Sequence, residues 1–345
     1  YIAEELLQRN LGLKIIWVTA IPNISVPSGI QIVKYGTIRA AYHWITARVW
    51  VDNIKSTIRP PKRKGQYYIQ TWHSTLGFKK NEEDAENLPI RYIEQAKADG
   101  KQIDLMYSDN DFRCDKYRNH FWYSGEVLKC DVPRTGALLK ENKMRINKVY
   151  CELKVNPKRK IVLYAPTFRK NVDKTVYYVN ADAICKMLEK KFGESFTFAL
   201  RLHPNNADIA DEIAKEMNVV NATKYPDMQE LLVASAVLIT DYSGCMFDFG
   251  FARKPVFLLA KDVERYIKEE RKWYFGLDEV PFTLSRSEKE LCESVEKFDE
   301  EEYKHQCEIF EKKIGFSDSG NGAKISDNMG DDSFSKVFRS VNPNG

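Results

Sequence analysis

The stretch Ser235-Ala-Val-Leu-Ile-Thr-Asp-Tyr-Ser-Gly-Cys-Met-Phe-Asp-Phe-Gly-Phe-Ala252 decides how the rest of the chain is interpreted. Its first part, Ala236 to Thr240, is a short apolar run rich in β-branched residues, which predicts a strand buried in a parallel sheet. The polar residues Asp241 to Gly244 then interrupt the run before a segment with helical spacing begins. The stretch therefore predicts a strand, a tight turn and the start of a helix.

A turn of this kind is suited to binding an anion. The first N–H groups of a helix have no partner within the helix and carry the positive end of its dipole, so a diphosphate can dock there. Ser243 is expected to cap the helix, Gly244 allows a ligand to approach the backbone, and Asp241 and Asp248 add carboxylates nearby. The alternative is an ordinary turn between a strand and a helix.

Length and composition indicate a globular protein with two domains. The chain has 345 residues, of which 43% are hydrophobic and 30% are charged. The net charge of +4 argues against a dedicated nucleic-acid binder, but it permits a basic groove for phosphorylated substrates or a basic face toward an anionic membrane. No apolar run approaches the roughly 20 residues that span a bilayer, so any work at a membrane is expected from its surface.

The seven cysteines are scattered without a CxxC spacing, and their odd number fits poorly with a disulfide framework. They are interpreted as reduced thiols of a cytoplasmic protein. The sequence shows no signal peptide and starts with Tyr1 rather than Met, so we expect the chain to be part of a longer gene product.

Short apolar runs alternate with helical spacing along the chain, which predicts doubly wound α/β domains. Strands are expected at residues 14–18, 30–34, 49–52, 67–71, 103–108, 127–132, 161–164, 196–202, 219–220, 236–240 and 254–259. Helices are expected at residues 1–10, 35–50, 182–192, 208–217 and 226–232, within 81–100 and 141–160, and throughout the charged region after 262. The remaining expectations are a loop at 133–136, a short closing helix at 324–329, and a division into domains at 1–145 and 146–328 with a poorly ordered tail at 329–345.

His73 is the candidate general base of the first half. It lies where a predicted strand ends, and an imidazole there can accept a hydroxyl proton near neutral pH. The alternative is a histidine whose hydrogen bonds are satisfied within the fold. Asp109-Asn-Asp111 has the D-x-D form that holds a divalent cation in many sugar transferases, but a turn at the strand exit is the favoured interpretation.

Polar residues follow several predicted strands of the second half. Open α/β sheets bind ligands beyond the carboxyl ends of their strands, where a hydroxyl and a guanidinium fork can bind phosphate oxygens. We therefore expect these residues to lie along one edge of the sheet. They are Thr167, Arg169, Arg201, His203, Asp241, Ser243 and Gly244.

Several motifs together make the chain resemble the CDP-glycerol glycerophosphotransferase family, which makes teichoic-acid and capsule polymers. The matching stretches follow the family's order over nearly the whole chain. They are Lys34-Tyr-Gly-Thr-Ile-Arg-Ala40, Tyr68-Ile-Gln-Thr-Trp-His-Ser-Thr75, Pro133-Arg134, Tyr164-Ala-Pro-Thr-Phe-Arg169, Leu200-Arg-Leu-His-Pro204, Ala236-Val-Leu-Ile-Thr-Asp-Tyr-Ser243, Met246-Phe-Asp248 and Asp318-Ser-Gly-Asn-Gly-Ala-Lys324. The chain departs from the family at Ser74, Leu202 and Gly244 and in the shortened basic stretch Phe78-Lys-Lys80.

The resemblance implies a GT-B architecture, in which two Rossmann-like domains face each other across a cleft and the second binds the CDP-linked donor. It also implies catalytic roles for His73 and His203. The implied donor-binding residues are Thr167, Arg169, Arg201, Asp241, Tyr242, Ser243 and Gly244, and further candidates are Asp248, Pro226, Asp227 and Arg134.

The expected activity is transfer of glycerol phosphate from CDP-glycerol to a hydroxyl of a teichoic-acid-like or capsular polymer, with CMP as leaving group. No metal or cofactor is required in this hypothesis. The expected partners are CDP-glycerol, a polyol-phosphate or glycan acceptor and an anionic membrane at the inner face of the cell, but no nucleic acid. Two alternatives remain: the same fold with CDP-ribitol or a nucleotide sugar as donor, and a non-catalytic module that binds polyanions.

Overall fold

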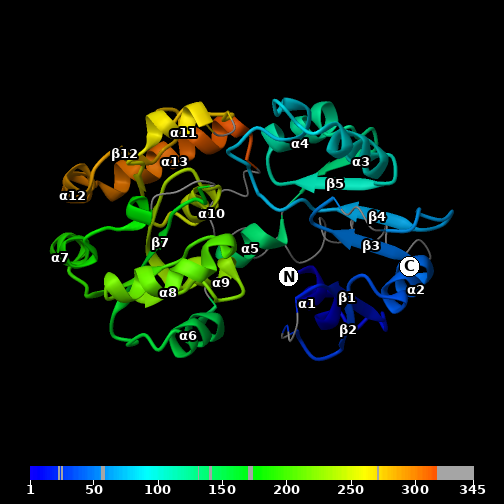
Figure 1. The fold of residues 1–345 in the computed structure, drawn as a ribbon, viewed down its shortest axis with the longest axis horizontal. Helices are drawn as coiled ribbons and strands as arrows, with labels where there is room; N and C mark the ends of the chain where they lie inside the picture. The colour runs from blue at the N-terminus through cyan, green and yellow to red at the C-terminus, as the bar shows by residue number, and fades with distance from the viewer. Residues whose placement is uncertain are drawn as a thin grey trace. The chain divides into compact units, whose positions relative to one another are not determined.

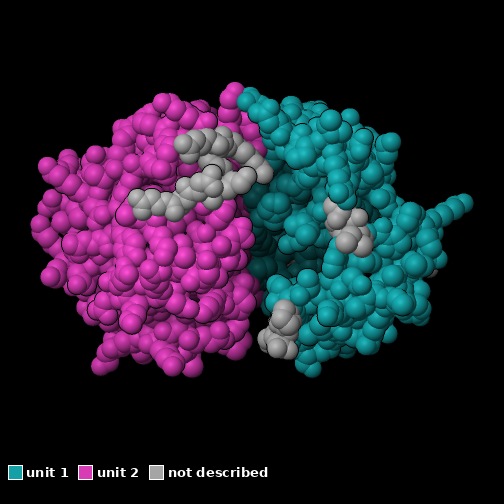
Figure 2. Space-filling view, viewed as in Figure 1, with its two compact units in different colours: residues 1–74, 81–136, 317–345 teal, residues 75–80, 137–316 magenta. Residues whose placement is uncertain are grey.

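The computed structural model describes residues 1–21, 24, 26–55, 59–130, 132–139, 142–169, 174–269 and 272–316. These residues form two compact units, which Figure 2 distinguishes by colour. Unit 1 comprises residues 1–74 and 81–136, and unit 2 comprises residues 75–80 and 137–316. The predicted domain boundary between residues 145 and 146 stays a prediction, and the expected closing helix, the tail and the motif at 318–324 lie outside the described residues.

Unit 1 contains a four-stranded parallel sheet with the order β3-β4-β5-β6 (Figure 1). Its strands are β3 (Val49–Asp52), β4 (Tyr67–Gln70), β5 (Leu105–Ser108) and β6 (Glu126–Lys129). The accompanying helices are α1 (Ile2–Gln8), α2 (Ile38–Thr46), η1 (Glu82–Asp84), α3 (Ile90–Gly100), α4 (Asp111–His120) and α5 (Pro133–Leu139), the last of which continues into unit 2.

The first two predicted strands do not join this sheet. β1 (Ile15–Thr19) and β2 (Ile30–Lys34) pair with each other as a separate parallel sheet, a division that the sequence pattern did not predict. Val33 is the one buried residue of these two strands. They therefore lack the second buried face that a central strand of a parallel sheet needs.

Alternate residues of the unit 1 strands pack on opposite faces, as the two-residue period of a strand requires. Tyr68 and Met106 face a cluster that includes Tyr117 of α4, whereas Ile69 and Leu105 face the other side. α4 begins at Asp111 because the side chain of Asn110 accepts a hydrogen bond from the Arg113 amide at 2.8 Å. Asp109 and Asn110 therefore connect β5 to α4, and Asp111 is the first residue of that helix.

Unit 2 contains a six-stranded parallel sheet with the order β12-β11-β10-β7-β8-β9. Figure 1 labels β7 and β12 of this sheet. The strands are β7 (Lys160–Ala165), β8 (Phe196–Leu200), β9 (Val220–Asn221), β10 (Ser235–Thr240), β11 (Val256–Leu259) and β12 (Thr283–Ser285). The helices are α6 (Lys143–Glu152), η2 (Lys174–Tyr177), α7 (Ala181–Phe192), η3 (Pro204–Asn206), α8 (Ala207–Glu216), α9 (Met228–Ala234), α10 (Cys245–Phe251), α11 (Val263–Glu269), α12 (Glu288–Lys297) and α13 (Glu300–Ile314).

The strand order reverses in the middle of this sheet. From β7 the chain builds outward through β8 and β9, and then returns to place β10 on the other side of β7 before continuing to β11 and β12. Such a switch point leaves a crevice at the carboxyl ends of the two central strands, where open α/β sheets bind their ligands. The stretch from Ser235 to Ala252, which contains β10, lies at this switch point.

The unit 2 core explains why its strands were recognisable. Val162, Val237 and Phe257 face a large cluster to which helices α7, α8 and α12 contribute, and the alternate residues Leu163, Leu238 and Leu258 are buried outside this cluster. All seven residues of α10 are buried as well. Strands covered on both sides are continuously apolar, which is the pattern that the sequence shows.

Three local predictions are wrong. Residues 133–136 begin helix α5 rather than forming a loop, because Pro133 at a first helical position needs no N–H partner. Strand β12 was missed within the charged region that was predicted to be helical throughout. Helix α9 begins at Met228 rather than at Pro226, since the Asp227 side chain accepts hydrogen bonds from the first amides of the helix.

All seven cysteines lie in described segments, and none of them forms a disulfide bond there. In the described part of the chain, no helix combines the length and apolarity needed to cross a membrane.

Candidate functional site

The ends of three neighbouring strands meet at one edge of the unit 2 sheet, which we call the carboxyl edge. β7 pairs with β10 on one side and with β8 on the other, and all three are parallel. The Thr240 hydroxyl ties the two central ends together by donating to the Ala165 carbonyl at 2.7 Å. The predicted residues that follow these strands therefore lie at the same edge, while their binding roles stay predictions.

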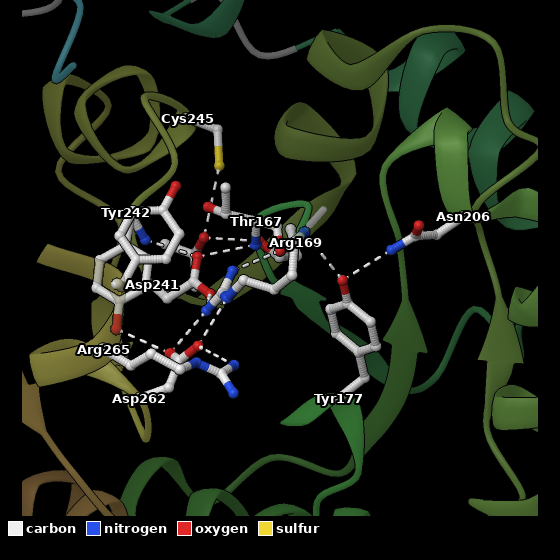
Figure 3. A network of polar contacts seen from close by, with 12 residues as sticks. Thr167, Arg169, Tyr177, Asn206, Asp241, Tyr242, Cys245, Asp262 and Arg265 are labelled. Atoms are coloured by element: carbon white, nitrogen blue, oxygen red, sulfur yellow. Dashed lines mark hydrogen bonds and ion pairs between the residues drawn. The ribbon is translucent and has the colours of Figure 1, made fainter. Parts of the chain in front are cut away.

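Arg169 is held between two carboxylates at this edge, as Figure 3 shows. Its Nη2 donates to Asp241 at 2.7 Å and to Asp262 at 2.9 Å, and its Nε donates to the second oxygen of Asp262 at 2.8 Å. Its Nη1 donates to the Thr167 carbonyl at 2.5 Å. The geometry gives Arg169 a part in holding the edge together, and direct contact with phosphate stays a prediction.

The Asp241 carboxylate connects the exits of the two central strands. One of its oxygens accepts from the Thr167 amide at 2.8 Å and the Tyr242 amide at 2.6 Å, and the other accepts from Arg169. Asp241 is also 2% exposed, so its carboxylate is buried and stabilises the edge from within the fold. The predicted nearby carboxylate is present, but it is occupied by protein donors.

Charge and aromatic rings stabilise this arrangement. Burial acts to lower the pKa of Arg169, but Asp241 and Asp262 outweigh it and raise that pKa above its ordinary value. Burial acts to raise the pKa of Asp262, but Arg169 outweighs it and the pKa falls below its ordinary value. The guanidinium also lies over the rings of Tyr242 and Tyr266, which stack 3.9 Å apart.

The turn after β10 differs from the prediction in one detail. Gly244, not Ser243, is the N-cap of α10, and the Ser243 hydroxyl accepts a weak hydrogen bond from the Cys245 amide at 3.5 Å. Gly244 has an ordinary φ of −60°, and a Cβ built on it meets nothing within 4 Å. The open space over Gly244 leaves the backbone accessible to a ligand.

Two further groups at the carboxyl edge have donors to offer. The Oγ1 atom of Thr167 is buried and has no hydrogen-bond partner among the described residues. Arg201 uses its Nη1 to donate to the carbonyls of Ala222 at 3.0 Å and Tyr225 at 2.6 Å, and burial lowers its pKa. These backbone contacts fix the guanidinium of Arg201 at the end of β8.

The tautomer of His203 follows from its hydrogen bond. Its Nδ1 accepts from the Asn205 amide at 3.2 Å, so the proton of the neutral ring lies on Nε2. Burial, with help from the positive charges of Lys79 and Arg201, lowers the pKa of His203 and favours the neutral ring. His203 therefore presents an Nε2–H donor.

His73 in unit 1 has the opposite tautomer. Its Nδ1 lies 3.0 Å from the Asn53 carbonyl, which can only accept, so Nδ1 carries the proton and Nε2 is left as a base. The ring packs on Trp72 with centroids 4.4 Å apart, and Arg134 donates to the His73 carbonyl at 2.6 Å. Burial, assisted by the charges of Arg113 and Arg134, lowers the pKa of this imidazole.

The backbone before His73 is strained. Trp72 has a φ of +56°, a left-handed conformation that is uncommon for a bulky residue. The Trp72 amide donates to the Gln70 side chain at 2.9 Å, which helps to hold this conformation. Strain of this type is often found at functional sites, where the surrounding contacts fix the position of a side chain.

The candidates Asp248, Asp227 and Pro226 lie on or just before helices α10 and α9, and their binding roles stay predictions. Asp248 is 1% exposed on α10 and accepts from Gln229 at 3.0 Å. Asp227 caps α9, as described above, and Pro226 precedes this cap without a polar side chain. Asp248 and Asp227 therefore have hydrogen bonds within unit 2.

Sequence reasoning missed Asp262 and Lys79. Asp262 follows β11 at a distance of 93 residues from its partner Arg169, and no local pattern pointed to that pairing. Lys79 belongs to unit 2, where its backbone forms an isolated antiparallel β-bridge with Trp273. Its Nζ donates a hydrogen bond to the Tyr266 hydroxyl. The basic pair in Phe78-Lys-Lys80 was the signal that pointed toward it. The described residues contain no cluster of three or more His, Cys, Asp or Glu side chains suited to a metal ion.

Unit 2 has a parallel sheet with hydrogen-bond donors at its carboxyl edge, beside the switch point. Proteins of this α/β class bind their ligands at the carboxyl ends of the strands. The model of the family described as CDP-Glycerol:Poly(glycerophosphate) glycerophosphotransferase matches residues 1–328, and the chain belongs to this family. The predicted resemblance is thereby confirmed.

Named relatives and solved structures agree with this membership. The chain is 26% identical to the Teichoic acid poly(glycerol phosphate) polymerase of Staphylococcus epidermidis over 338 residues, which cover 94% of this chain and 47% of the relative. It is also 26% identical to the Teichoic acid glycerol-phosphate transferase of Staphylococcus aureus, covering 81% of this chain and 74% of that protein. The chain therefore spans about half the length of the S. epidermidis polymerase.

A structure of the Wall Teichoic Acid Polymerase TagF superposes with a TM-score of 0.80 at 26% identity, covering 99% of this chain and 86% of that one. A TagF variant whose structure includes CDPG gives a TM-score of 0.79. This likeness confirms the predicted α/β class and GT-B-like fold.

Proposed function

We propose that the chain transfers glycerol phosphate from CDP-glycerol to a hydroxyl group of a teichoic-acid-like or capsular polymer and releases CMP. Family membership supports the donor and the reaction type. The observation that carries the proposal is the pair of histidines with opposite tautomers, because a phosphoryl transfer to a hydroxyl needs both a proton acceptor and a donor to phosphate.

In the proposed reaction, the acceptor oxygen attacks the phosphorus that carries glycerol. A new O–P bond forms, and the bond between this phosphorus and the bridging oxygen breaks, so that CMP leaves with the bonding electrons. His73 accepts the hydroxyl proton at Nε2. The Nε2–H of His203 donates to the diphosphate, and Arg201, Thr167 and the Ser243-Gly244 backbone stabilise its charge.

The decisive experiment is incubation of the protein and a teichoic-acid acceptor with a panel of CDP-glycerol, CDP-ribitol and UDP-sugars, followed by measurement of the nucleotide released. CMP from CDP-glycerol alone is the expected result. CMP from CDP-ribitol would assign the ribitol alternative, and a UDP product would assign a nucleotide sugar. Salt-sensitive binding to polyanions with no nucleotide release would indicate the non-catalytic alternative.

We also infer that the chain works at an anionic membrane surface. Ile38, Tyr42 and Ile45 are exposed on α2, with Ile38 at 90%, and their spacing places them on one face of the helix. Lys34 and Arg39 lie exposed close by in sequence, which suits a surface with negative headgroups. An apolar helix face flanked by basic residues supports attachment from the surface.

A further inference from the structure

Arg113 of α4 is a buried cation that has no carboxylate partner among the described residues. The residue is 0% exposed, and none of its three side-chain nitrogen atoms meets an acceptor among the described residues. A guanidinium carries five N–H donors, and leaving them unsatisfied in the interior is costly. The capping of α4 involves only the backbone amide of Arg113, so the helix does not require this side chain.

Two other arginines with buried side chains show how unusual this is. Arg59 pairs with Asp99 at 2.5 Å and with Asp52 at 3.3 Å. Arg169 likewise has two carboxylates. Arg113 instead has aromatic rings, since its guanidinium carbon lies 4.9 Å from the Tyr117 ring and 5.1 Å from the Phe121 ring.

The same rings lead to His73. Phe121 contacts Trp72 edge-on at 5.0 Å, and Trp72 packs on the His73 imidazole at 4.4 Å. Three successive ring contacts, through Phe121 and Trp72, therefore connect Arg113 to the His73 imidazole. Apolar rings screen a charge less than water does, so the field of Arg113 reaches the imidazole.

The charged groups that act on His73 come from three elements. Arg113 on α4 and Arg134 on α5 disfavour a protonated ring, whereas Glu82 on η1 favours it. The Glu82 carboxylate is itself occupied by the Lys55 ammonium and the Tyr92 hydroxyl. Burial is the main cause of the lowered pKa of His73, and among the charged groups the two cations outweigh Glu82.

We propose that Arg113 is a positioning residue for His73: a buried cation without a described carboxylate partner, it is held over the Tyr117 and Phe121 rings so that the imidazole stays neutral with Nε2 open to a proton. The inference deepens the proposed function, on which it rests. It explains why a costly buried charge is present beside a base without touching it.

The test is an NMR titration of the His73 imidazole in the wild type and in Arg113→Met and Arg113→Lys. The chain has five histidines, so the missing signal in His73→Gln assigns the resonance. In Arg113→Met the titration midpoint rises by roughly half a pH unit, as expected for loss of one partly screened charge, and Arg113→Lys keeps the wild-type midpoint. The low-pH limb of CMP release shifts by the same amount.

Arg118→Met is the matched control, because it removes the same charge from an exposed position on the same helix and leaves the midpoint unchanged. Arg113→Gln is a second neutral variant should Arg113→Met not fold. An unchanged midpoint in a folded neutral variant overturns the inference, as does a loss of stability without any shift. The titration needs no turnover, so a wild type that releases no CMP refutes the proposed function while the role of Arg113 is still tested.

Discussion

Replacing Asp241 with Asn removes the carboxylate that joins the two central strand ends of unit 2. The substitution keeps the size of the side chain, so it creates no cavity. The amide retains one acceptor oxygen, but its NH₂ group must then face either the Arg169 guanidinium or the amides of Thr167 and Tyr242, all of which are donors. Asp241→Asn therefore loses an ion pair and sets two donors against each other.

The size of the effect follows from what remains. Removing one partner of a buried ion pair costs about 3 to 5 kcal/mol when the other charge is left alone. Arg169 keeps Asp262, so we expect a value near the lower limit, about 3 kcal/mol. Asp262→Asn is expected to cost less, about 2 kcal/mol, because the Asp262 side chain is 12% exposed and Arg169 keeps the more deeply buried partner.

Hydrogen exchange measured by mass spectrometry on the peptide 235–252 tests this prediction. A local loss of about 3 kcal/mol raises the exchange rate of protected amides roughly a hundredfold. Asp211→Asn is the control, because its ion pair with Lys224 is exposed on both sides and its loss leaves the peptide unchanged. Exchange within about threefold of the wild type in Asp241→Asn would refute the reasoning.

Four further predictions concern the site and the surface. His73→Ala lowers CMP release by roughly 10²- to 10⁴-fold but leaves CDP-glycerol affinity, measured by calorimetry, within twofold. Gly244→Ala keeps its unfolding midpoint, since the added Cβ meets no atom, but weakens CDP-glycerol binding; unchanged binding would exclude a ligand above this turn. Ile38→Glu abolishes flotation with anionic vesicles, whereas Ile309→Glu on α13 does not. The folded-state pKa values of His73 and His203 lie below 6.5, so the unfolded chain binds more protons than the folded chain as pH falls through 6.5. The free energy of unfolding therefore decreases in this range. Urea unfolding at pH 5.5 and 7.5 measures this decrease.

The strands of unit 2 were predictable because burial on both faces leaves an uninterrupted apolar run in the sequence. The polar residue that ends such a run, for example Asp241 after Thr240, then marks the carboxyl end of the strand. β12 escaped prediction because it has three residues and one buried position. β1 and β2 were recognised as strands, but no local pattern tells which sheet a short strand joins.

The role of Arg169 was not predictable from its surroundings in the sequence. A guanidinium after a strand suits phosphate, and that local inference was sound. Whether the fork faces a ligand or a carboxylate depends on Asp262, which only the folding of β11 beside β10 brings near. The ion pair between Arg169 and Asp262, which are distant in sequence, therefore determines the partner of the guanidinium, and the local motif did not.

The two histidines carry this point further. Both were assigned to the reaction from the same kind of pattern, an imidazole after a strand, and both have a lowered pKa. What separates them is a single backbone contact: Nδ1 of His73 faces the Asn53 carbonyl and that of His203 faces the Asn205 amide. A carbonyl partner requires the proton on Nδ1, and an amide N–H partner requires Nδ1 to be without a proton. The loops that hold the two rings therefore make His73 a base and His203 a donor at Nε2. Exchanging either contact would leave two bases or two donors, and in the proposed mechanism transfer needs one of each.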